Sequence, residues 1–138
     1  IEYLEKEELL RTSDVVTLHV PVTPSTTNFI NRDTLALMKP SAILINCARG
    51  AVVNSADLAE AVKTGKLYGA GIDTIDPEPV SPEDPLVCLP EPWKYRVILS
   101  PHIAGTTVSV FCSSYRNFFR ALASVRAGEK PNNVVNGL

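Results

Sequence analysis

Short apolar runs alternate with amphipathic segments along the chain. Four runs rich in β-branched and aliphatic residues are each stopped by proline, glycine or polar residues, and they cover residues 14–20, 42–47, 67–74 and 96–100. Runs of this length with few polar positions are typical of strands buried on both faces of a sheet. The pattern therefore predicts four short buried strands.

The segments between these runs have apolar residues spaced three and four apart, which predicts helices. The expected helices cover residues 2–10, 31–39 and 54–65, with a longer one from Thr106 to Gly128. Asn54 is a good N-cap, and Asp57 three residues later places a carboxylate near free N–H groups. Leu35 and Met38 are expected on the inner side of their helix.

The long helix near the end of the chain has the clearest periodicity. Its repeating apolar positions include Phe111, Phe118 and Phe119. We interpret these rings as core residues and not as a platform for stacking a base, because they share one apolar stripe.

Strands that alternate with helices, each strand apolar nearly throughout, predict an α/β fold with a parallel sheet. Such sheets bind ligands beyond the carboxyl ends of their strands. The segments to inspect are therefore residues 19–21, 47–50, 73–78 and 101–102. Together they offer arginine, carboxylate and imidazole side chains, so this edge is the predicted functional edge.

Composition narrows the class of protein. With 138 residues, 45% hydrophobic and 20% charged, the chain has the size and composition of one domain or part of one, and not of a disordered, collagenous or coiled-coil protein. The longest apolar runs are too short for a membrane span. A net charge of −2 argues against a nucleic-acid surface.

The three cysteines are an odd number without a C-x-x-C pair, which predicts no disulfide framework, no metal site and a cytoplasmic location. The first residues do not have the pattern of a signal peptide, and none is expected here. Because residue 1 is Ile and a helix is already under way, we expect a piece of a longer chain or a processed one.

Three residues after the strands could carry chemistry. Arg49 could clamp a carboxylate or phosphate through its planar fork, although for this residue taken alone a solvated surface arginine or a structural ion pair is the more common explanation. Glu78 lies between Pro77 and Pro79 in a stiff segment that could hold a carboxylate against a partner, or it is a plain acidic loop residue. His102 could transfer a proton, or it is a histidine at a helix entry or in the core.

Other polar residues have more ordinary interpretations. His19 lies inside an apolar strand pattern, which favours a core or backbone-bonding role. Asp73 could bond a ribose or amide group, or cap the loop that follows. Cys47 is interpreted as a small strand-end residue without a nearby base. Residues 69–71 (GAG) resemble the start of a dinucleotide glycine motif, but no glycine stands at residue 74 and no helix follows, so we reject them as a phosphate loop.

Several motifs in a fixed order resemble one known family. They are SDVVTLHVP at 13–21, LMK at 37–39, INCARG at 45–50, GAGID at 69–73, PEP at 77–79 and PHIAG at 101–105. On these motifs the chain is similar to the D-isomer-specific 2-hydroxyacid dehydrogenases, almost from end to end. The resemblance implies the second half of a Rossmann-like, doubly wound NAD-binding domain.

The resemblance also implies roles for individual residues. Arg49 would bind the substrate carboxylate, His102 would be the general acid–base, and Glu78 would keep His102 protonated. The positions that match the cofactor lining of the family are Val20, Cys47, Ala48, Arg49, Asp73, His102 and Gly105. Hydride transfer between NAD and a 2-keto acid develops alkoxide charge, which an imidazolium and a guanidinium stabilise.

The resemblance further implies how the chain is organised. Residues 1–105 would be part of the dinucleotide-binding domain, and residues 106–138 a crossover helix and tail that return toward a substrate domain. The phosphate-binding loop, most of the substrate domain and the acidic residue that selects NAD over NADP would precede residue 1. NADP, and the identity of the 2-hydroxy acid, therefore stay open.

The full-length protein is expected to act as a homodimer on a small 2-hydroxy or 2-keto acid, without nucleic-acid or membrane partners. An alternative from another class is a non-enzymatic NAD-sensing or corepressor-like module of the same family. The 138-residue chain alone is expected to be inactive and to self-associate, because its sheet would have an unpaired apolar edge.

Overall fold

The computed structural model describes residues 1–132 and 134, and it divides into two compact units. The first unit is Ile1–Pro101 and the second is His102–Leu138. All four strands lie in the first unit, and the longest helix lies in the second.

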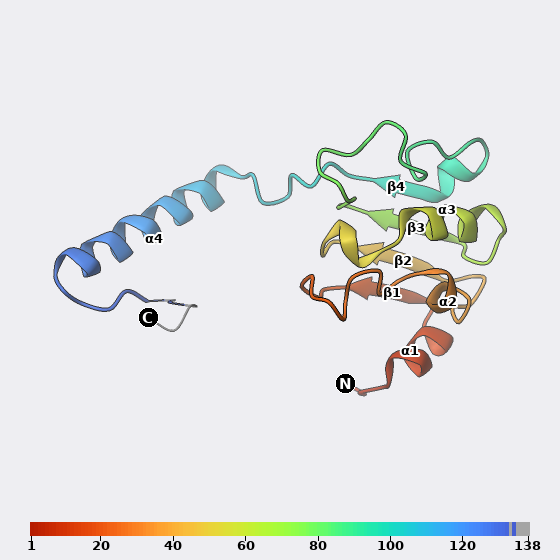
Figure 1. Ribbon diagram of the computed structural model, residues 1–138, viewed down its shortest axis with the longest axis horizontal. Coiled ribbons are helices and arrows are strands. Elements are labelled where there is room, and N and C mark those ends of the chain that lie inside the picture. Colours follow the sequence, from red (N-terminus) through yellow and green to blue (C-terminus); the bar gives the residue numbers. More distant parts are fainter. Residues whose placement is uncertain (133, 135–138) are drawn as a thin grey trace. The chain divides into compact units, whose positions relative to one another are not determined.

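The first unit is built on a parallel sheet with strand order β1-β2-β3-β4, as Figure 1 shows. The strands are β1 Val15–Leu18, β2 Ile43–Asn46, β3 Gly69–Ile72 and β4 Val97–Leu99. The register pairs Leu18 with Asn46, Asn46 with Ile72, and Ile72 with Leu99. Each strand therefore ends at the same level, and the segments that follow all begin at one edge of the sheet.

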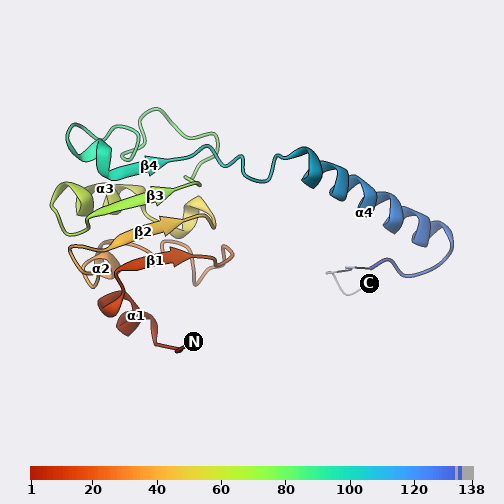
Figure 2. The same cartoon turned by 180° about the vertical axis from the view of Figure 1, so that it is seen from behind.

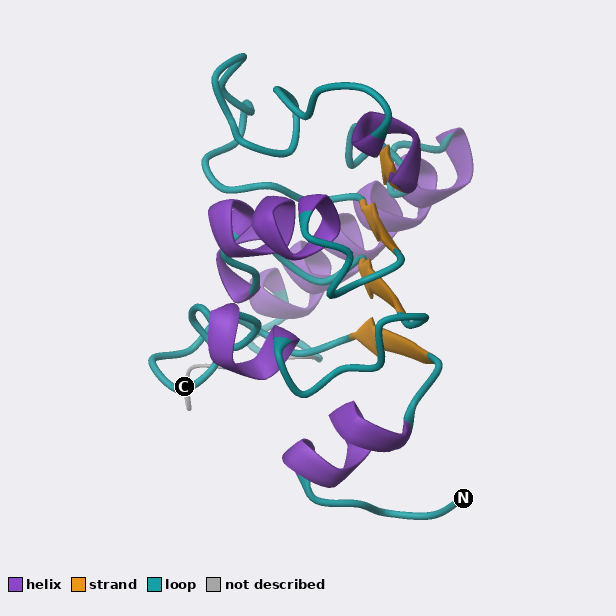
Figure 3. Cartoon of the chain, turned by 90° about the vertical axis from the view of Figure 1, so that its right-hand side faces the viewer, coloured by secondary structure: helices purple, strands orange, loops and turns teal. Residues whose placement is uncertain are grey.

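The first unit also contains three helices and two short turns. They are α1 Lys6–Thr12, α2 Arg32–Leu35 and α3 Ser55–Lys63, with short 3-10 turns η1 Gly50–Val52 and η2 Trp93–Arg96. Figure 3 shows α2 and α3 on the same side of the strands. The residues of β1 and β2 are alternately buried and more open, because successive side chains point to opposite faces.

The hydrophobic core lies between the sheet and these helices. Val16 and Leu44 from the strands are buried with Leu58 and Val62 from α3 and with Leu35 from α2. The opposite face is seen in Figure 2, and there Val15 and Ile98 keep 57% and 74% of their surface exposed. Within this unit the two faces of the sheet thus differ sharply in burial.

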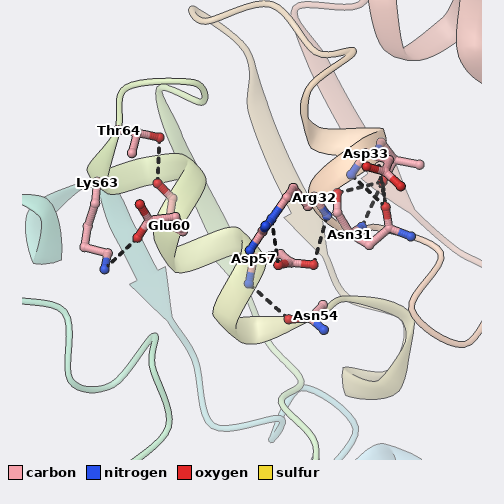
Figure 4. Close-up of polar contacts among 9 residues, drawn as sticks. Asn31, Arg32, Asp33, Asn54, Asp57, Glu60, Lys63 and Thr64 are labelled. Atoms are coloured by element: carbon pink, nitrogen blue, oxygen red, sulfur yellow. Dashed lines mark hydrogen bonds and ion pairs between the residues drawn. The ribbon is translucent and has the colours of Figure 1, made fainter.

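Local signals for helix ends were confirmed. The Asn54 side chain accepts a hydrogen bond from the Asp57 backbone N–H, and Gly65 follows α3 with a φ of 70°. The Asp57 carboxylate also accepts from the backbone N–H of Arg32 at 2.9 Å, as Figure 4 shows. Asp57 therefore joins the first turn of α2 to the first turn of α3.

Several predicted boundaries were too wide. The four strands are shorter than their apolar runs, and the helix expected over 2–10 begins only at Lys6. In α1, Leu10 is buried but Leu9 is exposed. The helix expected over 31–39 is regular only from Arg32 to Leu35, although Leu35 and Met38 are buried as predicted. Two residues of these runs that lie before their strands, Ala42 and Leu67, are still buried in the core.

The second unit contains α4, which runs from Val108 to Arg126. The Thr107 hydroxyl accepts a hydrogen bond from the Val110 N–H, and Gly128 follows the helix with a φ of 75°. The helix and its end therefore agree with the sequence pattern.

The interpretation of the α4 rings as core residues was wrong for this unit. Phe111 is 52% exposed, and Phe118 and Phe119 are each 62% exposed. The last two rings meet edge to face with their centroids 5.5 Å apart. Among the described residues of this unit α4 has no second layer against which to bury its apolar stripe.

Close packing between β3 and β4 gives a test of this fold. A Cβ added at Gly69 would collide with the backbone carbonyl oxygen of Arg96, whereas one at Gly71 would meet only the Ile45 Cδ1 at 3.1 Å. We expect Gly69→Ala to destabilise the protein by about 1–3 kcal/mol, and Gly71→Ala by clearly less, because a side-chain tip yields more easily than backbone. Thermal unfolding of both variants measures the difference, and equal losses would contradict the proposed packing.

Candidate functional site

The carboxyl edge of the sheet gathers most of the predicted site residues of the first unit. Val20 follows β1, Cys47 and Ala48 follow β2, and Asp73 follows β3. Ala48 is buried, Val20 and Asp73 are half-buried, and Cys47 is exposed. Because the strand ends are in register, these residues belong to one edge, as the pattern predicted.

Arg49 lies on a tight turn directly after β2. The side chain of Asn46 holds this turn from inside: its Oδ1 accepts from the Ala48 N–H at 3.0 Å, and its Nδ2 donates to the Arg49 carbonyl oxygen at 3.0 Å. The Arg49 side chain is exposed, and its Nη1 donates to the Ala48 carbonyl oxygen at 2.7 Å. The guanidinium is thus anchored through one nitrogen, and it has further N–H donors for a ligand.

The next residue connects this turn to the segment that carries Glu78. A Cβ added at Gly50 would overlap the Ile75–Asp76 peptide and would lie 2.8 Å from the Ile75 Cα. Glycine is required here because two backbone segments touch. The structure therefore brings the Arg49 turn against the start of the Asp76–Pro79 segment, in which Glu78 is exposed.

Asp73 is tied to both neighbouring strands. Its backbone N–H donates to the carbonyl oxygen of Asn46 at 2.9 Å, and the Ser100 hydroxyl donates to its carboxylate. The bond from Ser100 orients the carboxylate at the level where β3 and β4 end. Sequence reasoning missed both Asn46 and Ser100, although a polar residue at the end of the apolar run 42–47 was a visible signal for Asn46.

The expectation for His19 was wrong. His19 is exposed, and its Nε2 lies 2.9 Å from the Thr17 hydroxyl. β1 ends at Leu18, so His19 is beyond the paired part of the strand and outside the core. The buried residues of this run are Val16 and Leu18, which alternate with exposed ones.

His102 and Gly105 belong to the second unit. His102 is exposed and has a φ of 51°, in the left-handed region that few non-glycine residues adopt. Gly105 is exposed, and a Cβ at this position would meet no atom within 4 Å. The predicted grouping of His102 with Arg49 and Glu78 stays a prediction.

A surface groove of about 730 Å³ lies elsewhere in the first unit, between α2, α3 and residues 85–90. Four of its charged residues form two pairs, Arg32 with Asp57 at 3.7 Å and Lys63 with Glu60 at 2.9 Å (Figure 4), and Lys66 also lines it. The hydrogen bond and charge of Lys63 lower the pKa of the Glu60 carboxyl from its usual value. Because this groove contains no predicted site residue, it is a weaker candidate for the functional site.

Two further properties concern the described residues as a whole. Residues 1–132 and 134 contain no group of three or more His, Cys, Asp or Glu side chains arranged to hold a metal ion. Among the same residues, no helix has both the length and the apolar character that crossing a bilayer requires.

A parallel sheet with polar residues at its carboxyl edge is typical of α/β domains that bind nucleotide cofactors. The family model "D-isomer specific 2-hydroxyacid dehydrogenase, NAD binding domain" matches residues 1–104. Since this match covers more than half of the chain, the chain belongs to that family. The predictions of family and of NAD as the cofactor agree with this result.

Curated relatives place the chain within longer proteins. It is 39% identical to a glyoxylate reductase of Korarchaeum cryptofilum over 136 residues, which are 99% of this chain and 40% of that protein. It is 50% identical to a D-3-phosphoglycerate dehydrogenase of Haemophilus influenzae over 101 residues, 73% of this chain and 24% of that protein. The chain thus spans about 40% of the length of the glyoxylate reductase, and less of the phosphoglycerate enzyme.

Solved structures support the same fold. The TT0316 protein from Thermus thermophilus is 42% identical with a TM-score of 0.84, covering 96% of this chain and 40% of that one. The NAD complex of a D-isomer specific 2-hydroxyacid dehydrogenase from Lactobacillus delbrueckii ssp. bulgaricus is 31% identical with a TM-score of 0.82, covering 97% and 43%. The expected α/β fold, half of a Rossmann-like NAD-binding domain, is confirmed.

The contact at Gly50 gives a test of the site geometry. We expect Gly50→Ala to push the Arg49 turn away from Ile75 and Asp76, because backbone cannot move aside as a side-chain tip can. We expect this variant to lose about 1–3 kcal/mol of stability. We also expect faster proteolysis within residues 76–95. Gly71→Ala is the control, since its neighbour is a side-chain methyl. Unchanged proteolysis of Gly50→Ala would contradict the contact.

Proposed function

We propose that the protein containing this chain is an NAD-dependent oxidoreductase that interconverts a D-2-hydroxy acid and its 2-keto acid. Membership of the dehydrogenase family is the observation that carries this proposal. The relatives named glyoxylate reductase and D-3-phosphoglycerate dehydrogenase, and the solved D-lactate dehydrogenase of Lactobacillus jensenii at 30% identity, all support it.

The side chains at the carboxyl edge of the sheet have the chemistry needed to bind a dinucleotide. The exposed guanidinium of Arg49 and the oriented carboxylate of Asp73 suit the polar groups of a nucleotide, and no bulky side chain follows β2 before Arg49. The residues that would hold the cofactor are Val20, Cys47, Ala48, Arg49, Asp73, His102 and Gly105. When bound, the cofactor supplies or accepts the hydride. A similar structure at 28% identity binds NADPH, so NADP stays open.

Arg49 would bind the substrate carboxylate. Its planar fork makes two parallel hydrogen bonds to a carboxylate, which fixes orientation as well as position. The bond from Nη1 to the Ala48 carbonyl limits the freedom of the side chain before substrate binds. The same positive charge would stabilise the alkoxide that develops on the keto oxygen.

His102 would give a proton to the keto oxygen during reduction and take it back during oxidation. Glu78 would favour the protonated imidazole through its negative charge.

Further predictions concern the full-length protein. They are a homodimer, a cytoplasmic location, and the absence of nucleic-acid and membrane partners. The division into residues 1–105 and 106–138 is also a prediction.

Replacing Arg49 tests the carboxylate-binding role. In the natural full-length protein, we expect Arg49→Lys to lower kcat/KM for 2-keto acids by about 100-fold, because lysine keeps the charge but loses the planar fork. Steady-state oxidation of NADH with a panel of 2-keto acids measures the effect. Arg32→Lys is the matched control, because Arg32 lies in the groove of the first unit and should leave turnover unchanged. Equal turnover of Arg49→Lys and wild type would contradict the role.

Replacing His102 tests proton transfer. We expect His102→Ala to lower kcat by about 10²–10⁴-fold, with NADH still bound, because general acid help is lost in the transition state. Turnover and NADH fluorescence are measured on the same samples. If the wild-type protein binds NADH but reduces no 2-keto acid, the non-enzymatic module becomes the better description.

A further inference from the structure

Asn46 is a polar residue in a position that the sheet otherwise fills with apolar side chains. It is the last residue of β2, it pairs in register with Leu18 and Ile72, and its exposure is 0%. Burying an amide is unfavourable unless its hydrogen bonds are satisfied. A leucine or valine would fill this core position without that cost, so the amide needs an explanation beyond packing.

Both side-chain hydrogen bonds of Asn46, and one from its backbone, lead to the candidate site. Its side chain binds the backbone on both sides of the Ala48–Arg49 peptide, accepting from the Ala48 N–H and donating to the Arg49 carbonyl oxygen, each at 3.0 Å. Its own carbonyl oxygen accepts from the Asp73 N–H at 2.9 Å. One buried residue therefore contacts the backbone of both Arg49 and Asp73.

We propose that Asn46 is a positioning residue that sets the direction in which the Arg49 side chain leaves the sheet edge. This inference rests on the proposed function of Arg49. Asn46 fixes the carbonyl of Arg49, Gly50 then packs on Ile75 and Asp76, and Arg49 is left extended with a φ of −146°. Because the guanidinium lies at the end of a long side chain, a small rotation of this backbone moves it far from a bound carboxylate.

A purely structural role makes a different prediction. It would lower stability, and kcat/KM would fall only as far as the protein unfolds. A positioning role lowers kcat/KM for the acid in folded protein, and it does so only while Arg49 is present. The two roles can therefore be separated by combining substitutions at Asn46 and Arg49.

The experiment uses Asn46→Ser in the natural full-length protein. A serine hydroxyl can still accept from the Ala48 N–H in the same kind of turn, but it is too short to reach the Arg49 carbonyl. We expect kcat/KM for 2-keto acids to fall by about 10- to 100-fold and the Kd of NADH to rise by a smaller factor, because the acid loses an oriented partner. Asn46→Ala removes both bonds and should lose at least as much.

Asn54→Ala is the matched control. It also removes an asparagine whose Oδ1 accepts from a backbone N–H, but at the start of α3 and away from the Arg49 turn. We expect it to lower the melting temperature, as loss of an N-cap does, and to leave kcat/KM unchanged. An equal fall in kcat/KM for Asn54→Ala and Asn46→Ser would overturn the proposal.

A double-mutant cycle with Arg49→Ala completes the test. We expect Asn46→Ser to reduce kcat/KM by no more than about threefold when Arg49 is already absent, since residues that act through one another are not additive. A full 10- to 100-fold further loss would overturn the positioning role while leaving that of Arg49 intact. If Arg49→Ala alone keeps wild-type kcat/KM, the proposed function of Arg49 fails, and the inference fails with it.

Discussion

The common register of the four strand ends is the constraint on which the rest of the structure depends. Leu18, Asn46, Ile72 and Leu99 end their strands as direct neighbours, so every following segment starts at one edge. A slip of one residue would exchange the two faces of a strand. Such a slip in β2 would expose Leu44 and take the Asn46 amide away from the Arg49 turn. Packing beneath α3 therefore fixes the register, and the register decides which groups share the edge.

The order of the elements could be predicted because its signals are local. The apolar runs indicated the strands, and Asn54 and Gly65 marked the ends of α3 where the structure has them. The lengths could not be predicted in the same way, since the number of paired residues depends on a neighbouring strand. His19 illustrates the difference, because it lies in an apolar run but beyond the last paired residue of β1.

Arg49 and Asp73 could be placed at the edge from sequence because each follows a strand. Their supporting contacts could not, since they join residues that are brought together only by folding. Ser100 binds Asp73 across 27 positions of sequence, and Gly50 is required by a segment that begins at Ile75. The exposure of Phe111 could not be predicted from the sequence either, because the apolar positions of a helix do not indicate which other element packs on them.

The segment that connects β3 to β4 is held to the core at some positions and exposed at others. Leu86 and Leu89 are buried in the core, and the Asp84 carboxylate accepts from the Leu86 N–H at 2.8 Å, whereas residues 76–80 are exposed. Insertions between such anchors leave the strand ends where they are, because loop length has a small entropic cost. Residues 76–80 can therefore vary in length while the strand ends and the Arg49 turn keep their places.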